Sequence, residues 1–263
     1  MFIVLWAGLS APLLIPVIKK YVPQGGAAPL PIRLYIEIVC TVTIFIAAWV
    51  VLRFIDRRSF VSLGFARRNL VRDTLIGLVT GLGMMAVCVA LLYAFGWLRW
   101  DATVAFSGSA LILATLAMVA NTLTQEVLVR GYVQQTIQSQ FGTGAGIILS
   151  AMFFFALHLG AIQNRFLPAI SLFAAGILLA TAYAVSGNLW FPIALHFGWN
   201  FLQGPVLGQA VSGQAVGAGW RLFQVDGPAL MTGGNFGIEG GLIAITITIL
   251  ATPFVLMTYP RRR

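Results

Sequence analysis

The chain has 263 residues, of which 59% are hydrophobic and only 9% are charged. Soluble domains carry roughly 25% charged residues, so this composition excludes an ordinary water-soluble fold. The formal net charge of +9 would indicate nucleic-acid binding in a soluble protein, but here the arginines stand in short segments between apolar runs, which is typical of membrane topology. The sequence therefore predicts an all-α, multi-pass transmembrane helical bundle that does not bind nucleic acid.

About eight apolar stretches are long enough to cross a bilayer, whose core of ~30 Å needs roughly 20 helical residues. The predicted spans are residues 2–18, 34–52, 74–97, 113–137, 143–160, 167–186, 189–204 and 241–259. They leave no soluble domain over, so we expect residues 1–263 to form a single integral membrane domain. The first span has neither a basic start nor a small-residue cleavage pattern, which favours a retained helix.

The loop between the second and third spans is rich in arginine, and such loops stay on the cytoplasmic side of a bacterial inner membrane. It holds Arg53, Arg57, Arg58, Arg67, Arg68 and Arg72. Eight spans then place both termini in the cytoplasm, in agreement with the C-terminal Arg261, Arg262 and Arg263. The glycine-rich residues 205–240 are expected to form a long outer loop, either functional or a flexible connector.

Four ionisable residues stand out inside the predicted helices, where each costs on the order of 3 kcal/mol at the bilayer centre and so needs an explanation. They are Glu126 and Arg130 in the fourth span, His158 in the fifth and His196 in the seventh. Glu126 and Arg130 are spaced i, i+4 on one helical face, and so are His196 and Asn200. With 1.5 Å of rise per residue, the four can share one layer if the fourth helix continues past Arg130 to about residue 138.

Three motifs follow one another along these helices: Gln125-Glu126-x-x-x-Arg130, Phe154-x-x-x-His158 and His196-x-x-x-Asn200. In this order they resemble the Glu-Glu-x-x-x-Arg, Phe-x-x-x-His and His-x-x-x-Asn motifs of the CPBP family. These are the CAAX prenyl protease 2 and bacteriocin-processing intramembrane peptidases, also called the Abi family. Glycine-rich stretches at 198–204 and 233–241 are also similar to bacterial members, so the resemblance covers roughly residues 110–245.

The resemblance implies a metal-independent glutamate peptidase, without a cofactor, that cleaves a protein or peptide in or at the lipid bilayer. It places Gln125 and His158 at the attacking water, His196 and Asn200 at the oxyanion, and Glu126 beside Arg130. A peptide carbonyl gains negative charge when water attacks it. Donors fixed in a dry site can stabilise that charge by about 3 kcal/mol each.

Gln125 departs from the family pattern, which has its general base, a glutamate, at this position. An amide cannot accept the proton of a water molecule, and the loss of a general base costs about 10²- to 10⁴-fold in rate. Glu126 is a poor substitute if it pairs with Arg130, since a neighbouring cation makes a carboxylate less basic. Three interpretations stay open: an engineered inactive variant, a natural pseudoenzyme, or a member in which Glu126 or His158 serves as the base.

Other kinds of site were weighed against a peptidase. Two histidines and a glutamate can bind zinc, but the sequence lacks the His-Glu-x-x-His motif, and we expect no metal. Intramembrane carboxylates and histidines also form proton relays, so a proton-coupled transporter is an alternative. A catalytically inactive protein that binds a peptide or lipoprotein is another. Cys40 and Cys88 lie in apolar runs without motif spacing and are expected to be core residues.

Overall fold

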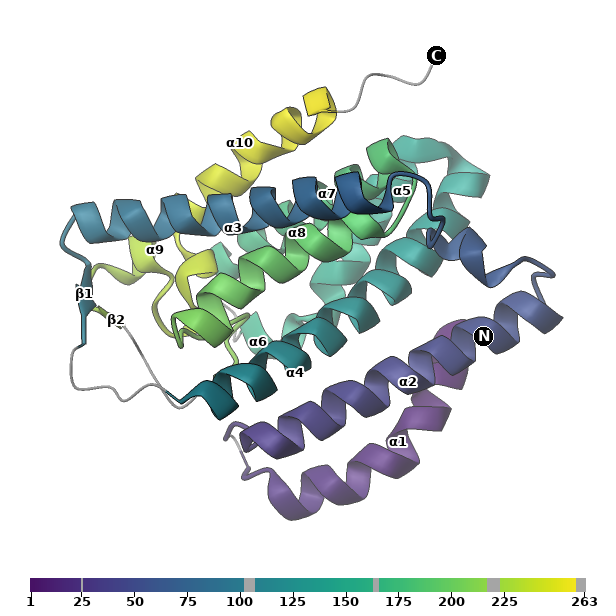
Figure 1. Ribbon diagram of the computed structural model, residues 1–263, viewed down its shortest axis with the longest axis horizontal. Coiled ribbons are helices and arrows are strands. Elements are labelled where there is room, and N and C mark those ends of the chain that lie inside the picture. The colour runs from purple at the N-terminus through teal and green to yellow at the C-terminus, as the bar shows by residue number, and fades with distance from the viewer. Residues whose placement is uncertain (25, 102–106, 163–165, 217–222, 259–263) are drawn as a thin grey trace.

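The computed structural model describes residues 1–24, 26–101, 107–162, 166–216 and 223–258. Its long elements are all helices, which confirms the all-α prediction, and β1 (Leu98–Trp100) and β2 (Phe223–Val225) form one short antiparallel pair. Figure 1 shows α1 and α2 along one side of the bundle and α10 along the opposite side. The long helices are α1 (Phe2–Tyr21), α2 (Leu30–Phe54), α3 (Leu70–Ala94), α4 (Gly108–Glu126), α5 (Gln135–Leu157), α7 (Phe166–Ser186), α8 (Trp190–Phe201) and α10 (Leu242–Thr258).

Each of the eight predicted spans overlaps one of these long helices. Within the described residues, five helical stretches are long and apolar enough to cross a membrane by length and composition. One of the five, residues 108–157, turns back at Gly142, whose φ of 84° and ψ of 169° interrupt the helix, and α8 and α10 are shorter than the others. The count of eight crossings and the cytoplasmic termini stay predictions, and Arg261, Arg262 and Arg263 lie outside the described residues.

The chain stays helical past Arg130, as a shared polar layer requires, but the helix is not uniformly α. The segment η2 (Val127–Gln134) is a π-helix that starts directly after Glu126 and leads into the first turns of α5. A second π-helix, η3 (Leu202–Val206), begins two residues after Asn200. Such wider turns occur frequently at functional sites, because they shift side chains out of the ordinary helical register.

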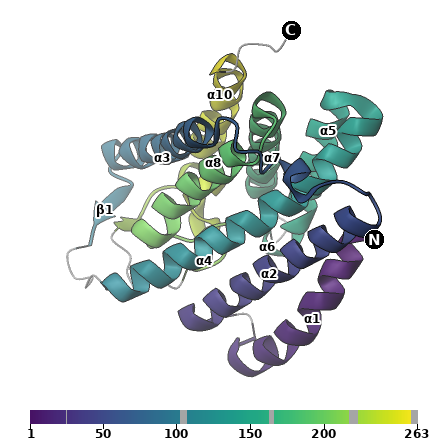
Figure 2. The same ribbon diagram turned by 45° about the vertical axis from the view of Figure 1, so that its right-hand side comes forward.

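The helix α8 lies between α3 and α4, as both views show (Figures 1 and 2). Glycines allow α3 and α8 to pack closely: a Cβ atom at Gly81 would overlap the carbonyl oxygen of Leu195, and one at Gly198 would lie 2.9 Å from that of Leu78. Small residues that bring helix backbones close are typical of helix pairs in membranes. This packing fixes the position of His196, which lies one residue beyond Leu195.

Candidate functional site

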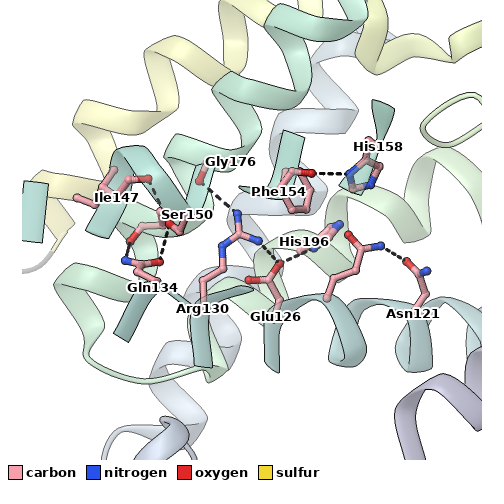
Figure 3. Close-up of polar contacts among 12 residues, drawn as sticks. Asn121, Glu126, Arg130, Gln134, Ile147, Ser150, Phe154, His158, Gly176 and His196 are labelled. Carbon is pink, nitrogen blue, oxygen red and sulfur yellow. Dashed lines mark hydrogen bonds and ion pairs between the residues drawn. The ribbon is translucent and has the colours of Figure 1, made fainter. Parts of the chain in front are cut away.

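Glu126 joins two helices through one carboxylate oxygen. Its Oε1 accepts a hydrogen bond from Nη1 of Arg130 at 3.0 Å and another from Nδ1 of His196 at 2.8 Å (Figure 3). The carboxylate and the guanidinium are fully buried. The helical spacing predicts the contact with Arg130, whereas the contact with His196 was not anticipated and brings the first and third motifs together.

The buried charge of Arg130 is stabilised by groups from two further helices, α7 and α5. Nη2 donates to the carbonyl oxygen of Gly176 on α7 at 3.2 Å, and the guanidinium carbon lies 4.6 Å from the ring centroid of Phe154 on α5. A buried ion pair is stable only when such additional contacts offset the cost of desolvating both ions. Arg130 therefore serves chiefly to hold the Glu126 carboxylate in place.

The contact with Glu126 also determines the protonation of His196. A carboxylate can only accept, so Nδ1 carries a proton and Nε2 is the nitrogen left for other partners. His196 and Asn200, one helical turn apart on α8, line the same cavity, which encloses about 50 Å³ of space for water. One water molecule needs roughly 10–15 Å³ measured in this way, so the cavity can hold a few. The other walls include Phe154, Ser171, Trp199, Ser212 and Thr248.

Glu239 also lines this cavity, and the sequence analysis missed it. Its Oε1 accepts hydrogen bonds from the backbone N–H of Ser212 and, at 2.9 Å, from the Ser212 hydroxyl; its Oε2 accepts one from Nε1 of Trp199 at 3.1 Å. Burial raises the pKa of Glu239 above the usual value, against the opposing effects of these hydrogen bonds and of His196. A lone carboxylate in a glycine-rich stretch was the available signal.

The segment around Glu239 is tightly packed, which favours the functional interpretation of this part of the 205–240 loop. Gly237 has a φ of 105°, and a Cβ atom there would overlap the carbonyl oxygen of Ala210. The hydroxyl of Ser171 on α7 donates to the backbone oxygen of Glu239 at 2.5 Å. Residues 217–222 of the same loop lie outside the described part of the chain.

Gln125 is oriented by a chain of hydrogen bonds. Its Nε2 donates to Oδ1 of Asn121 at 2.9 Å, and Nδ2 of Asn121 lies 3.1 Å from each oxygen of Glu37 on α2. Because the carboxylate accepts, the Asn121 amide must point its nitrogen toward Glu37 and its oxygen toward Gln125. Oε1 of Gln125 is then buried without a partner among the described residues, so it can accept a hydrogen bond from water but not a proton.

Glu37 is a second carboxylate that the sequence analysis missed. It lies within the predicted span 34–52, so the same argument that singled out Glu126 applies to it. Asn121 lies four residues before Gln125, and this spacing was the available signal for its contact with Gln125.

The sequence analysis places His158 within the fifth span. In the structure it lies directly after Leu157, the last residue of α5. Its Nδ1 donates to the carbonyl oxygen of Phe154 at 2.8 Å, which leaves Nε2 as an acceptor in the neutral ring. The Phe154 ring stands 4.7 Å from the His158 ring and 5.9 Å from the His196 ring, between centroids. His158 is thus one aromatic side chain away from the Glu126 network (Figure 3).

The structure therefore joins three of the six predicted site residues directly and arranges the others around them. Glu126, Arg130 and His196 form one network, and Asn200 shares the cavity with His196. Gln125 and His158 are not among the cavity-lining residues. The catalytic roles of all six residues stay predictions.

Groups that could hold a metal were sought separately. In the described part of the chain, no three side chains of His, Cys, Asp or Glu come together as a metal site would require. Cys40 and Cys88 are both free thiols, and Cys88 is buried in the core.

A comparison with protein families gives the first evidence from outside the chain. Residues 107–202 match the model of the family described as type II CAAX prenyl endopeptidase Rce1-like. The match includes the six predicted site residues and excludes Glu37 and Glu239. No match was found among curated proteins or among solved structures. Over residues 107–202, the segment that carries all three motifs, the chain is similar to the Rce1-like family.

Proposed function

We propose that this protein is an intramembrane endopeptidase that hydrolyses a peptide bond of a membrane-associated protein or peptide without a metal ion. The Rce1-like match supports an endopeptidase of the CAAX type at the level of the family. The observation that carries the proposal is the contact between Glu126 and His196, which fixes an imidazole beside Asn200 at a cavity large enough for water.

His196 and Asn200 are suited to stabilise the oxyanion. Water attacks the carbonyl carbon, and the electrons of the C=O double bond move to oxygen, which then carries a negative charge. Nδ2 of Asn200 can donate to this oxygen, and so can Nε2 of His196 when the ring is protonated beside Glu126. Donors that are already in place need no reorganisation during the reaction, and each is worth about 3 kcal/mol.

Gln125 determines which step of the reaction this chain cannot perform in the way of an enzyme with a glutamate at that position, namely removal of the water proton. Its free Oε1 can hold a water molecule but cannot take its proton. Oε1 of Glu126 already accepts from Arg130 and His196, and a neighbouring cation makes a carboxylate less basic. The acceptor of the proton must then be another group, and Nε2 of His158 is one candidate.

The second candidate function is binding without cleavage, and Gln125 is the observation that favours it. An inactive member would retain the cavity and the oxyanion donors and would hold a peptide or lipoprotein in the membrane. A peptide bound at the site must be extended in either case, because the carbonyl groups of a helix are already hydrogen-bonded within it.

Peptide cleavage by the protein in lipid nanodiscs tests the two functions. Suitable probes are fluorescence-quenched peptides with a C-terminal Cys-aliphatic-aliphatic-X sequence, each prepared with and without an S-farnesyl group. We expect cleavage that is insensitive to EDTA, and we expect His196→Ala to lower kcat by about 10²- to 10³-fold. If neither the wild type nor Gln125→Glu cleaves any probe while both bind one, the protein is a binding protein.

A further inference from the structure

The cavity beside His196 contains a carboxylate that the Rce1-like segment does not supply. Glu239 comes from the short turn η5 (Ile238–Gly240), beyond the end of the matched residues 107–202. Trp199 and Ser171 bind its side chain and its backbone, so the turn is attached to both α8 and α7. The site therefore has a wall that the family match does not describe.

The environment of Glu239 is unusual for a structural carboxylate. Its hydrogen-bond donors, from Ser212 and Trp199, are all neutral, and it has no ion-pair partner among the described residues. Glu126, in contrast, has a cation in direct contact. A carboxylate buried without a cation is costly, and such groups in membrane proteins mark functional sites.

One position on the Glu239 carboxylate remains free for a water molecule. A carboxylate has about four lone-pair sites, two on each oxygen. Ser212 occupies both sites of Oε1, and Trp199 occupies one site of Oε2, which leaves the second site of Oε2 without a partner among the described residues. The cavity that Glu239 lines has room for that water, and His196 and Asn200 line it too.

We propose that Glu239 is the general base of the peptidase reaction. It takes over the role of the glutamate that the family pattern has at the position of Gln125. This inference rests on the proposed function. Glu239 takes a proton from the water as its oxygen bonds to the carbonyl carbon, and the oxyanion forms beside His196 and Asn200. The protonated Glu239 then gives the proton to the amide nitrogen as the C–N bond breaks, which releases an amine and a carboxylic acid.

Glu239 fits this role better than His158 does. Two of the residues that line the cavity have titratable side chains, Glu239 and His196. His158 does not line the cavity. A base works best when its pKa is near the working pH, and burial moves the pKa of Glu239 upward in that direction. Trp199 and Ser212 hold the carboxylate in one place, as a base requires.

The experiment compares Glu239→Gln with the wild type on the peptides described above. We expect Glu239→Gln to lower kcat by about 10²- to 10⁴-fold, with KM nearly unchanged. Asp73→Asn is the matched control, because it also converts a buried carboxylate into an amide, but in the first turn of α3, where Asp73 accepts a hydrogen bond from Asn188. Thermal unfolding of each variant in nanodiscs shows that the lost activity is not lost folding.

A pH profile separates a base from a structural residue. The wild-type kcat should fall as the pH drops through the pKa of Glu239, because the protonated form cannot accept a proton. Ser212→Gly removes the hydroxyl donor but tolerates the positive φ of 48° at this position. Loss of that donor raises the pKa of Glu239 further, so the acid side of the profile should move to higher pH.

The outcomes distinguish this inference from the proposed function. If Gln125→Glu cleaves the peptides and the wild type does not, the peptidase site stands, but Glu239 is not its base. The same holds if Glu239→Gln keeps the wild-type kcat and pH profile, or if a His158→Gln variant shows the loss instead. If neither the wild type nor Gln125→Glu cleaves any peptide, both proposals fail.

Discussion

The two buried carboxylates next to His196 have opposite surroundings. Glu126 accepts from Arg130 and His196 through a single oxygen, deep between α4 and α8. Glu239 accepts only from neutral donors and faces a cavity that can hold water. A carboxylate that is hydrogen-bonded to a cation is a weaker base than one that accepts only from neutral donors in a buried site.

This difference separates structure from chemistry within one site. Glu126 positions His196 and balances the charge of Arg130, while Glu239 is free to exchange a proton. Removing Arg130, the cationic partner of Glu126, should therefore affect chiefly stability. Changes around Glu239 and the oxyanion donors should affect chiefly rate.

Arg130→Met should cause the largest loss of stability. It leaves Glu126 buried without its cation, and breaking a buried ion pair in this way costs about 3–5 kcal/mol. Unfolding of the protein by SDS in mixed micelles measures the change. Arg99→Met is the control, because the pair of Arg99 and Asp226 is largely exposed and should contribute less than about 1 kcal/mol. Similar losses in both variants would remove the distinction between the two carboxylates.

Asn200→Leu should lower kcat by about 10²- to 10³-fold with little change in stability, because it removes an oxyanion donor while keeping the branched shape of the side chain. Thr122→Val is the control: it removes a buried hydroxyl on α4 whose one partner among the described residues is the carbonyl oxygen of Met118 in its own helix. Its kcat should stay within about threefold of the wild type, given the modest net value of one hydrogen bond. Equal effects of the two substitutions would argue against a role for Asn200 at the oxyanion.

Glu37→Gln should have the smallest effect of the three. Asn121 can then turn its amide over, and Gln125 loses its fixed orientation, which is worth about 1 kcal/mol, or about fivefold in kcat. In a Gln125→Leu background this effect should vanish, because the amide to be oriented is absent. A Glu37→Gln effect that persists there would mean that Glu37 acts by another route.

Much of the architecture could be predicted because helices in membranes leave strong local signals. Long apolar runs marked all eight long helices, and the i, i+4 spacing predicted the contact of Glu126 with Arg130. The break at Gly142 falls in the predicted gap between the fourth and fifth spans. These features depend on residues that are close in sequence.

The remainder of the site depends on contacts between segments far apart in sequence. No local pattern connects Glu239 with Trp199 or Ser212, because the turn that carries Glu239 reaches the cavity only through tertiary packing. The π-helical turn after Glu126 likewise has no simple sequence signature. Glu37 is different, since its place in an apolar span was visible and its importance was overlooked.

The close packing of α3 against α8 has a consequence for how a substrate arrives. Where Gly81 and Gly198 bring the two backbones together, a peptide cannot pass between them unless the helices separate along several turns. His196 is on one of these two helices, so this side of the bundle is shut to lateral diffusion from the lipid. A substrate would have to approach from another direction, and the helix pair would act as the fixed wall against which it is held.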